Sequence, residues 1–148
     1  KKKKGVLIGE QSAENIKIKI GSAIDIKNPK SMEVRGRDFG AGMPKAITVD
    51  SNDIAAAVKR PLLNIINSIK GVLEKTPPEL SADIMDRGIA MSGGTSKLRN
   101  LDKLITKAIG VPAYVADEPM YCVAKGTGIA LELMAEGQRS FTFNKSIT

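Results

Sequence analysis

A short apolar segment at residues 89–91 runs directly into two glycines, Gly93 and Gly94, and then into a segment with helical periodicity. Glycine lets the backbone approach a ligand closely, and the amides at a helix N-terminus carry partial positive charge that suits phosphate or ribose groups. In α/β proteins such junctions hold nucleotides, although turns of this kind are also common without a ligand. The turn therefore indicates an α/β arrangement and leaves nucleotide binding open.

A second apolar segment, residues 111–115, follows a helical pattern that begins at Leu98 and reaches Ala108. Two apolar strands that flank one helix, with short connections, predict a right-handed βαβ unit with a parallel sheet. Buried parallel strands are normally covered on both faces, and two strands alone cannot form such a sheet. We therefore expect the missing strands to come from upstream sequence, from a partner chain or from weak strands that the pattern hides.

The first half of the sequence predicts a smaller unit of helices and antiparallel strands. Residues 12–20 fit both a helix and a strand, because isoleucines alternate with lysines, but Ser12 as an N-cap and Gly21 as a stop favour a helix. Two antiparallel strands are expected at residues 32–35 and 45–49, with a loose glycine-rich connection between them.

Three further segments are expected to be largely helical. A long helix capped by Asp50 or Ser51 is expected to run to about Lys75, with Pro61 kinking or interrupting it. Residues 79–85 form a short helical or irregular lead into the strand before the glycine turn. A final helix is expected from Pro119 or Met120 to about Ala135.

These patterns divide the chain into four predicted regions. They are a small α+β subdomain at residues 1–75, part of a βαβ subdomain at 76–118, a closing helix at 119–136, and an exposed or disordered tail at 137–148.

Composition limits the classes of function. The 148 residues contain one cysteine, Cys122, and no histidine, which excludes an internal disulfide and leaves no ordinary zinc site or Cys–His nucleophile. No apolar run approaches the roughly 20 residues that span a bilayer, and we expect no secretory signal, so a reducing cytoplasm is the expected compartment. The net charge is +7, but there is no Trp and there are only two Tyr and three Phe, so we expect no nucleic-acid partner.

Glu14 and Lys17 lie three residues apart and share one face if the segment is helical. An exposed ion pair explains them. The alternative is that the carboxylate accepts hydrogen bonds from an adenine amino group or from ribose hydroxyls, while the lysine stem packs on the base. That alternative requires a second group of residues that contacts the nucleotide from the opposite side.

Several blocks of the sequence together resemble, in order, the carboxy-terminal half of the MreB family of bacterial actins. The resemblance runs from about Gly5 to Glu132, through residues 9–17, 31–38, 73–80, 86–89, 92–95 and 122–132. It implies an α/β fold, namely an incomplete lobe of an actin-like ATPase (ribonuclease H-like) with a small α+β subdomain inserted.

The resemblance also implies an adenosine site made by two distant segments. It places the helix near the adenosine and the glycine turn on the opposite side, so the implied nucleotide-binding residues are Glu14, Asn15, Ile16, Lys17, Gly93, Gly94, Thr95 and Ser96. Thr95 stands where the family commonly has a third glycine. Because threonine adopts positive φ less easily, we expect the loop to hold adenosine differently or less tightly.

The implied cofactor is ATP or ADP with Mg²⁺, and the implied function is that of a nucleotide-dependent, filament-forming bacterial actin of the cell-shape cytoskeleton. The family's two aspartate-bearing phosphate turns do not occur in this sequence, so we expect the Mg²⁺ ligands outside it and no ATP hydrolysis by this chain alone. The alternative is a non-hydrolysing actin-like interaction module or regulator. The resemblance further implies self-assembly, a cytoplasmic location and a membrane surface or membrane protein as partner, although no segment here is assigned to membrane attachment.

Overall fold

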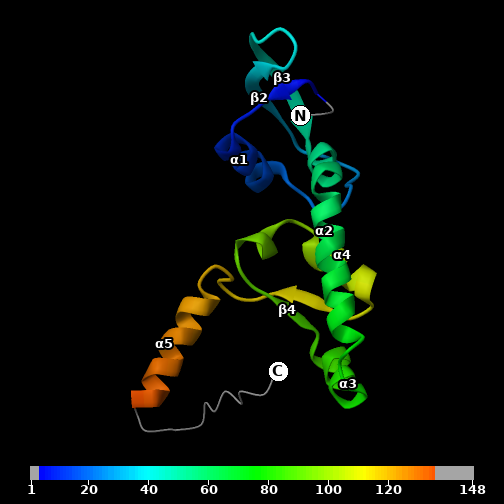
Figure 1. Cartoon of the computed structure of the whole chain (residues 1–148), viewed down its shortest axis with the longest axis vertical. Coiled ribbons are helices and arrows are strands. Elements are labelled where there is room, and N and C mark those ends of the chain that lie inside the picture. The colour runs from blue at the N-terminus through cyan, green and yellow to red at the C-terminus, as the bar shows by residue number, and fades with distance from the viewer. Residues whose placement is uncertain (1–3, 136–148) are drawn as a thin grey trace.

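The computed structural model describes residues 4–135, and its elements gather around two hydrophobic clusters. One cluster lies between helix α1 (Glu10–Ile20) and a three-stranded antiparallel sheet of order β1-β2-β3 (Val6–Leu7, Ser31–Asp38 and Pro44–Asp50). The other lies beside the parallel pair β4-β5 (Ile89–Met91 and Ala113–Val115) and helix α4 (Leu101–Ile109). Helix α2, Ser51–Leu73, runs along both groups of elements (Figure 1). Its residue Ile54 packs on the first cluster, whereas Leu62 belongs to the second, so α2 joins the two.

The predicted hairpin is confirmed and is longer than expected. β2 covers Ser31–Asp38 and β3 covers Pro44–Asp50, paired antiparallel. A two-residue strand, β1 (Val6–Leu7), pairs with the outer edge of β2 and was not predicted. Gly36 therefore lies inside β2 and not in the connection. A glycine is needed at this position, because a Cβ there would come within 2.3 Å of the Leu7 carbonyl oxygen.

The helical prediction for the first segment is confirmed, but its start is not. α1 covers Glu10–Ile20, and the N-cap is Gly9 with extended backbone (φ −71°, ψ 161°), so Ser12 lies inside the helix and is wrong as a cap. The carboxylate of Glu10 in the first turn favours this earlier start, because it faces the positive end of the helix dipole. Gly21 ends the helix as predicted.

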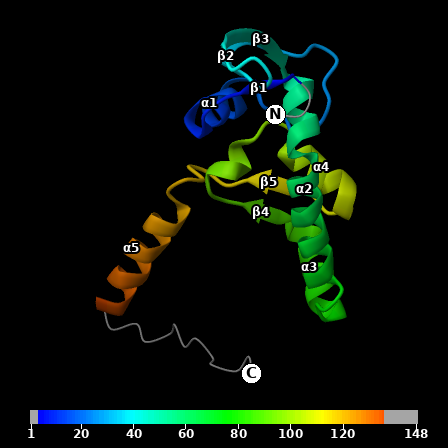
Figure 2. The same ribbon diagram turned by 45° about the horizontal axis from the view of Figure 1, so that its top comes forward.

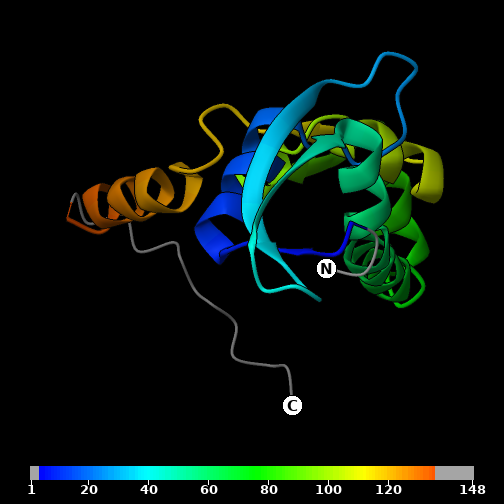
Figure 3. The same cartoon turned by 90° about the horizontal axis from the view of Figure 1, so that it is seen from above.

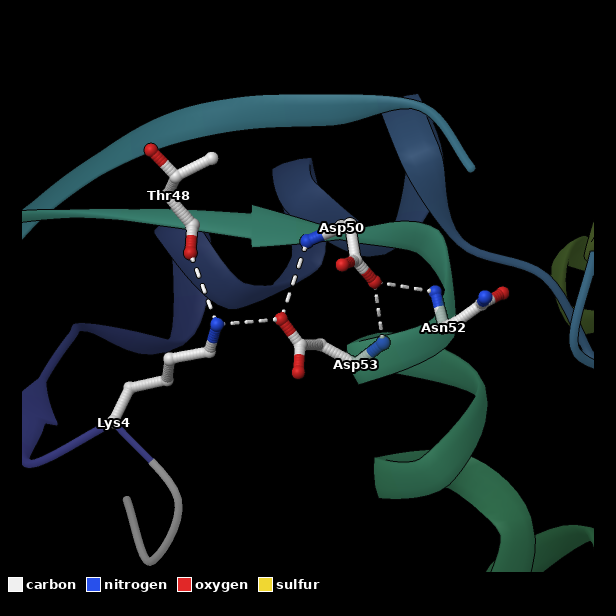
Figure 4. Close-up of polar contacts among 5 residues, drawn as sticks. All are labelled: Lys4, Thr48, Asp50, Asn52 and Asp53. Atoms are coloured by element: carbon white, nitrogen blue, oxygen red, sulfur yellow. Dashed lines mark hydrogen bonds and ion pairs between the residues drawn. The ribbon is translucent and has the colours of Figure 1, made fainter. Parts of the chain in front are cut away.

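The N-terminus of α2 is held by the predicted Asp50 cap (Figure 4). One carboxylate oxygen of Asp50 accepts from the amides of Asn52 (2.8 Å) and Asp53 (2.9 Å), and the Asp50 amide donates to Asp53 Oδ2 at 3.3 Å. Lys4 Nζ lies 3.0 Å from the same Asp53 oxygen and also donates to the Thr48 carbonyl at 3.3 Å. The cap thus ties the first residues of α2 to the segment before β1 and, through Lys4, to β3.

Pro61 does not interrupt α2, so the interruption allowed by the sequence analysis is wrong. The helix continues unbroken through this exposed proline to Leu73. Leu62 and Ile66, which follow it, are buried at 4% and 5% exposure, and their packing outweighs the single backbone hydrogen bond that proline cannot donate.

The βαβ segment is confirmed as a parallel pair, with a different helix boundary. α3 (Pro78–Arg87) leads into β4 (Ile89–Met91), and β5 (Ala113–Val115) pairs with β4 in parallel. A short 3-10 turn, η1 (Gly94–Lys97), follows the glycines, and α4 (Leu101–Ile109) begins only after it.

The predicted helix start at Leu98 is therefore wrong. Leu98 is extended (φ −62°, ψ 123°) and Asn100 is left-handed (φ 61°, ψ 16°), and these two conformations separate η1 from α4. The expectation of a buried second strand is also wrong, since Tyr114 and Val115 are 50% and 39% exposed.

α5, Cys122–Ala135, starts slightly later than predicted and stands apart from the other described elements (Figures 1, 2 and 3). It has no buried residue. The tail predicted at 137–148 and the last residue of the predicted closing helix lie outside the described residues. Across residues 4–135, the structure has no helix with the length and apolar character needed to cross a membrane.

Candidate functional site

α1 exposes the predicted ion pair on one face and buries the other. Glu14 Oε2 lies 2.6 Å from Lys17 Nζ, and the two side chains are 55% and 38% exposed. Ile16 and Ile20 point the other way, into the cluster that contains Val34. The pair matches the simple explanation of a surface ion pair worth a few tenths of a kcal/mol, and its exposure also leaves both groups accessible to a ligand.

The two remaining predicted residues of α1 differ in exposure. Asn15 is exposed, so its amide is available to a ligand. Ile16 is 4% exposed, so its side chain is committed to the core and only its backbone is open to a role at the site.

The glycine turn is held by an internal hydrogen bond, and its two glycines have free space beside them. Gly93 has φ +80°, a left-handed conformation that favours glycine, and its amide donates to the Pro119 carbonyl at 2.7 Å. Ser96 is 4% exposed, and its hydroxyl donates to the Gly93 carbonyl at 2.6 Å. A Cβ on Gly93 or Gly94 would meet nothing within 4 Å, so the outer side of the turn is free for a ligand to approach.

Thr95 fits this turn without backbone strain. The non-glycine residues with positive φ in the described chain are Asn100 and Glu118, and Thr95 is not among them. It lies inside the 3-10 turn, and its carbonyl accepts from the Leu98 amide at 3.0 Å. The conformational reason for expecting a perturbed loop at Thr95 is therefore removed.

The helix C-terminus and the segment after the glycine turn meet at Arg99, a residue that the sequence did not single out. Arg99 Nε donates to the Gly21 carbonyl at 2.8 Å, and its Nη2 donates to the Ile20 carbonyl at 2.6 Å. The Ala23 amide donates back to the Arg99 carbonyl at 2.8 Å. The contacts span almost eighty positions of sequence, which is why no local pattern reveals them.

The two predicted groups therefore lie on neighbouring elements without touching. Figures 1 and 2 show α1 beside the segment that links β4 to α4. Among the described residues, no hydrogen bond or ion pair joins Glu14, Asn15 or Lys17 to the turn at Gly93–Ser96.

A cavity of about 800 Å³ also adjoins the α1 pair. Its walls are the sheet, α1 and α2, and its lining is largely apolar, with Glu14 and Lys17 among the charged residues that line it. The glycine turn does not line it. The pair therefore borders this cavity, of which sequence patterns gave no sign.

Comparison with known proteins gives a consistent result. The family model for MreB/Mbl protein matches residues 1–139. The cell shape-determining protein Mbl of Bacillus cereus is 48% identical over 132 residues, which are 89% of this chain and 40% of that protein. The cell shape-determining protein MreB of Escherichia coli is 45% identical over 130 residues, 88% of this chain and 38% of that protein. The chain thus spans about two-fifths of the length of these curated relatives.

Solved structures agree with the sequence relatives. MreB5 of Spiroplasma citri bound to ADP matches with a TM-score of 0.87 and 33% identity, covering 93% of this chain and 42% of that one. A MamK double helical filament matches with a TM-score of 0.72 over 88% of this chain and 40% of that one, and its 19% identity supports the fold alone. The fold is that of an incomplete actin-like ATPase lobe, and the chain belongs to the MreB/Mbl family.

Proposed function

We propose that this chain supplies the adenosine-binding half of the nucleotide site in a nucleotide-dependent, filament-forming bacterial actin that acts in cell shape. The observation that carries the proposal is that two ligand-accessible groups, the α1 pair and the glycine turn, flank one junction in a chain similar to ADP-bound MreB5. A cytoplasmic location and a membrane surface or membrane-protein partner are part of the same proposal.

The chemistry of each group suits adenosine. The Glu14 carboxylate is an acceptor for ribose hydroxyls or for the adenine amino group, and the Lys17 stem offers an apolar surface to the base. On the other side, Gly93 and Gly94 allow close backbone approach, and the Gly94 and Thr95 amides donate to no acceptor within residues 4–135. Asn15 adds an exposed amide, Ile16 its backbone, and Ser96 the hydrogen bond that shapes the turn.

The phosphates and Mg²⁺ are proposed to be held by residues that are not in this sequence. Mg²⁺ would neutralise charge on the phosphates during phosphoryl transfer, and nothing in these residues supplies the aspartates and γ-phosphate donors together. The chain by itself is therefore expected to show no measurable ATP hydrolysis. Hydrolysis by the natural full-length polypeptide would separate an ATPase from the alternative, a non-hydrolysing actin-like interaction module.

The adenosine assignment is tested by equilibrium binding of a fluorescent ADP analogue to the natural full-length polypeptide. Glu14→Ala and Gly94→Val should each weaken binding while the circular dichroism spectrum is unchanged, since Glu14 is exposed and a Cβ at Gly94 meets no neighbour. Glu33→Ala is the matched control, because it also removes an exposed ion pair, with Arg35 at 3.1 Å. Unchanged affinity in both site variants would show that the assignment is wrong.

For self-assembly, we propose the hairpin tip between β2 and β3 as a contact element. Phe39 and Met43 are 71% and 65% exposed there, so this short connection presents two large apolar side chains to solvent. Met43→Ser should raise the critical concentration for assembly measured by sedimentation. Met85→Ser on α3 removes a side chain that is 66% exposed and should leave assembly unchanged. Equal effects of the two variants would count against the tip as a contact.

A further inference from the structure

A polar junction between the two groups of elements is formed by the buried Ser22 and Ser51 with the half-buried Arg99 and Asn100. Both serines are 0% exposed. No buried side-chain nitrogen or oxygen in residues 4–135 lacks a hydrogen-bond partner. A satisfied polar cluster of this kind specifies one arrangement of the elements around it, because any displacement leaves buried groups unpaired.

Arg99 is the centre of this junction. Its guanidinium donates to the carbonyls of Ile20 and Gly21 at 2.6 and 2.8 Å, and to Ser51 Oγ at 3.2 Å. Among the described residues it belongs to no ion pair, so its charge is directed at the carbonyl end of α1. That end carries partial negative charge, and a cation there is stabilising.

Asn100 gives independent support. It stands at the N-cap of α4, where an asparagine side chain normally accepts from the first helical amides, but no such bond is formed. Its amide donates instead to Ser22 Oγ at 3.1 Å, and its backbone is left-handed (φ 61°). The Asn100 side chain therefore does not cap α4 and instead contacts Ser22, in the segment that follows α1.

The location of the junction connects it with the site. Glu14 lies six residues before the anchored Ile20, about 9 Å along the helix at 1.5 Å per residue, so the anchor sets where its carboxylate lies. The glycine turn ends at Ser96, three residues before Arg99 in the chain. Arg99 is therefore covalently close to one half of the site and hydrogen-bonded to the helix that carries the other.

We infer that Arg99 is a positioning residue that fixes α1 against the glycine turn and so pre-forms the nucleotide site. The inference rests on the proposed adenosine site but has a structural consequence of its own. Without the anchor, α1 would sample positions in which Glu14 is misplaced. The apparent dissociation constant would rise as the competent fraction falls.

The test uses the natural full-length polypeptide in a Cys122→Ser background, with spin labels at Ile18→Cys on α1 and Lys103→Cys on α4, both exposed positions. Arg99→Ala should broaden the label-to-label distance distribution, and Arg99→Lys should broaden it less because the ammonium can still donate to a carbonyl at the end of α1. Asn100→Gly removes the contact with Ser22 but accepts the left-handed backbone, so it provides a folded variant that should also broaden the distribution.

Nucleotide binding is measured on the same variants. Arg99→Ala should raise the dissociation constant for the ADP analogue by on the order of tenfold, the factor that one hydrogen bond to a charged group contributes. The effect of Glu14→Ala should shrink in the Arg99→Ala background, a non-additivity that mere loss of stability does not produce.

The outcomes separate the two claims. Unchanged distance distributions in both Arg99→Ala and Asn100→Gly would overturn the positioning role whatever the affinities. Broadened distributions with additive effects on affinity would also overturn it. Broadened distributions with no effect of Glu14→Ala and Gly94→Val in the parent protein would instead overturn the proposed adenosine site, and the role of Arg99 in binding with it.

Discussion

Replacing Asp50 by alanine should loosen the start of α2, the helix that joins the two clusters. One Asp50 oxygen accepts from the amides of Asn52 and Asp53 at 2.8 and 2.9 Å, and alanine removes both bonds. Loss of an N-cap side chain typically costs about 0.5–2 kcal/mol. Because two amides lose their acceptor and the cap is only partly exposed, we expect about 1–2 kcal/mol.

The measurement is native-state hydrogen exchange of the amides at residues 54–57, the first that bond within α2. A loss of about 1–2 kcal/mol should accelerate their exchange roughly 5- to 30-fold. Asp50→Asn is the matched control, since asparagine keeps the acceptor and should change exchange by much less. If Asp50→Ala and Asp50→Asn accelerate exchange equally, or neither does, the capping argument is refuted.

Three further predictions concern the sheet, its hairpin and the second cluster. The hydrogen bond from Lys45, and then those from the backbone amides of the turn, lower the pKa of Asp38 from 3.8 to about 2. This carboxylate therefore stabilises the hairpin above about pH 4, and the contribution is lost as the pH falls toward 2, which an acid titration of hairpin chemical shifts would detect; Asp38→Asn should abolish that dependence. Gly36→Val should separate β1 from β2, because its Cβ would clash with the Leu7 backbone, and should speed exchange of the Phe39 amide, which donates to the Gly5 carbonyl at 2.8 Å; normal protection of that amide would contradict the packing. Ile105→Ala should lower the free energy of unfolding by about 2–5 kcal/mol in urea titrations, since Ile105 is 3% exposed, and a loss below about 1 kcal/mol would be inconsistent with its burial.

Local patterns predicted the elements that local physics determines. The hairpin, the Asp50 cap and the parallel pair follow from alternation, capping and apolar runs, each set within a few residues. The start of α4 was wrong because Leu98 and Leu101 keep a helical spacing although the backbone between them leaves the helix. β1 was missed because two residues carry no period.

The site divides in the same way. The i,i+3 spacing predicted the ion pair of Glu14 and Lys17, and the glycines predicted the open turn. Ile16 was implied as a site residue, but its side chain is buried, so only its backbone can take part. Arg99 was not evident, because its acceptors are backbone carbonyls almost eighty residues away, and a carbonyl has no residue identity to read from sequence.

The central claim is that adenosine lies between α1 and the glycine turn, and the most direct measurement is a structure of the natural full-length polypeptide with bound ADP. The account predicts the Glu14 carboxylate within hydrogen-bonding distance of the ribose hydroxyls or adenine amino group, with the Gly93–Gly94 backbone on the opposite side of the nucleoside. ADP bound with its adenosine inside the apolar cavity between α1 and the sheet, or away from α1 altogether, would contradict it.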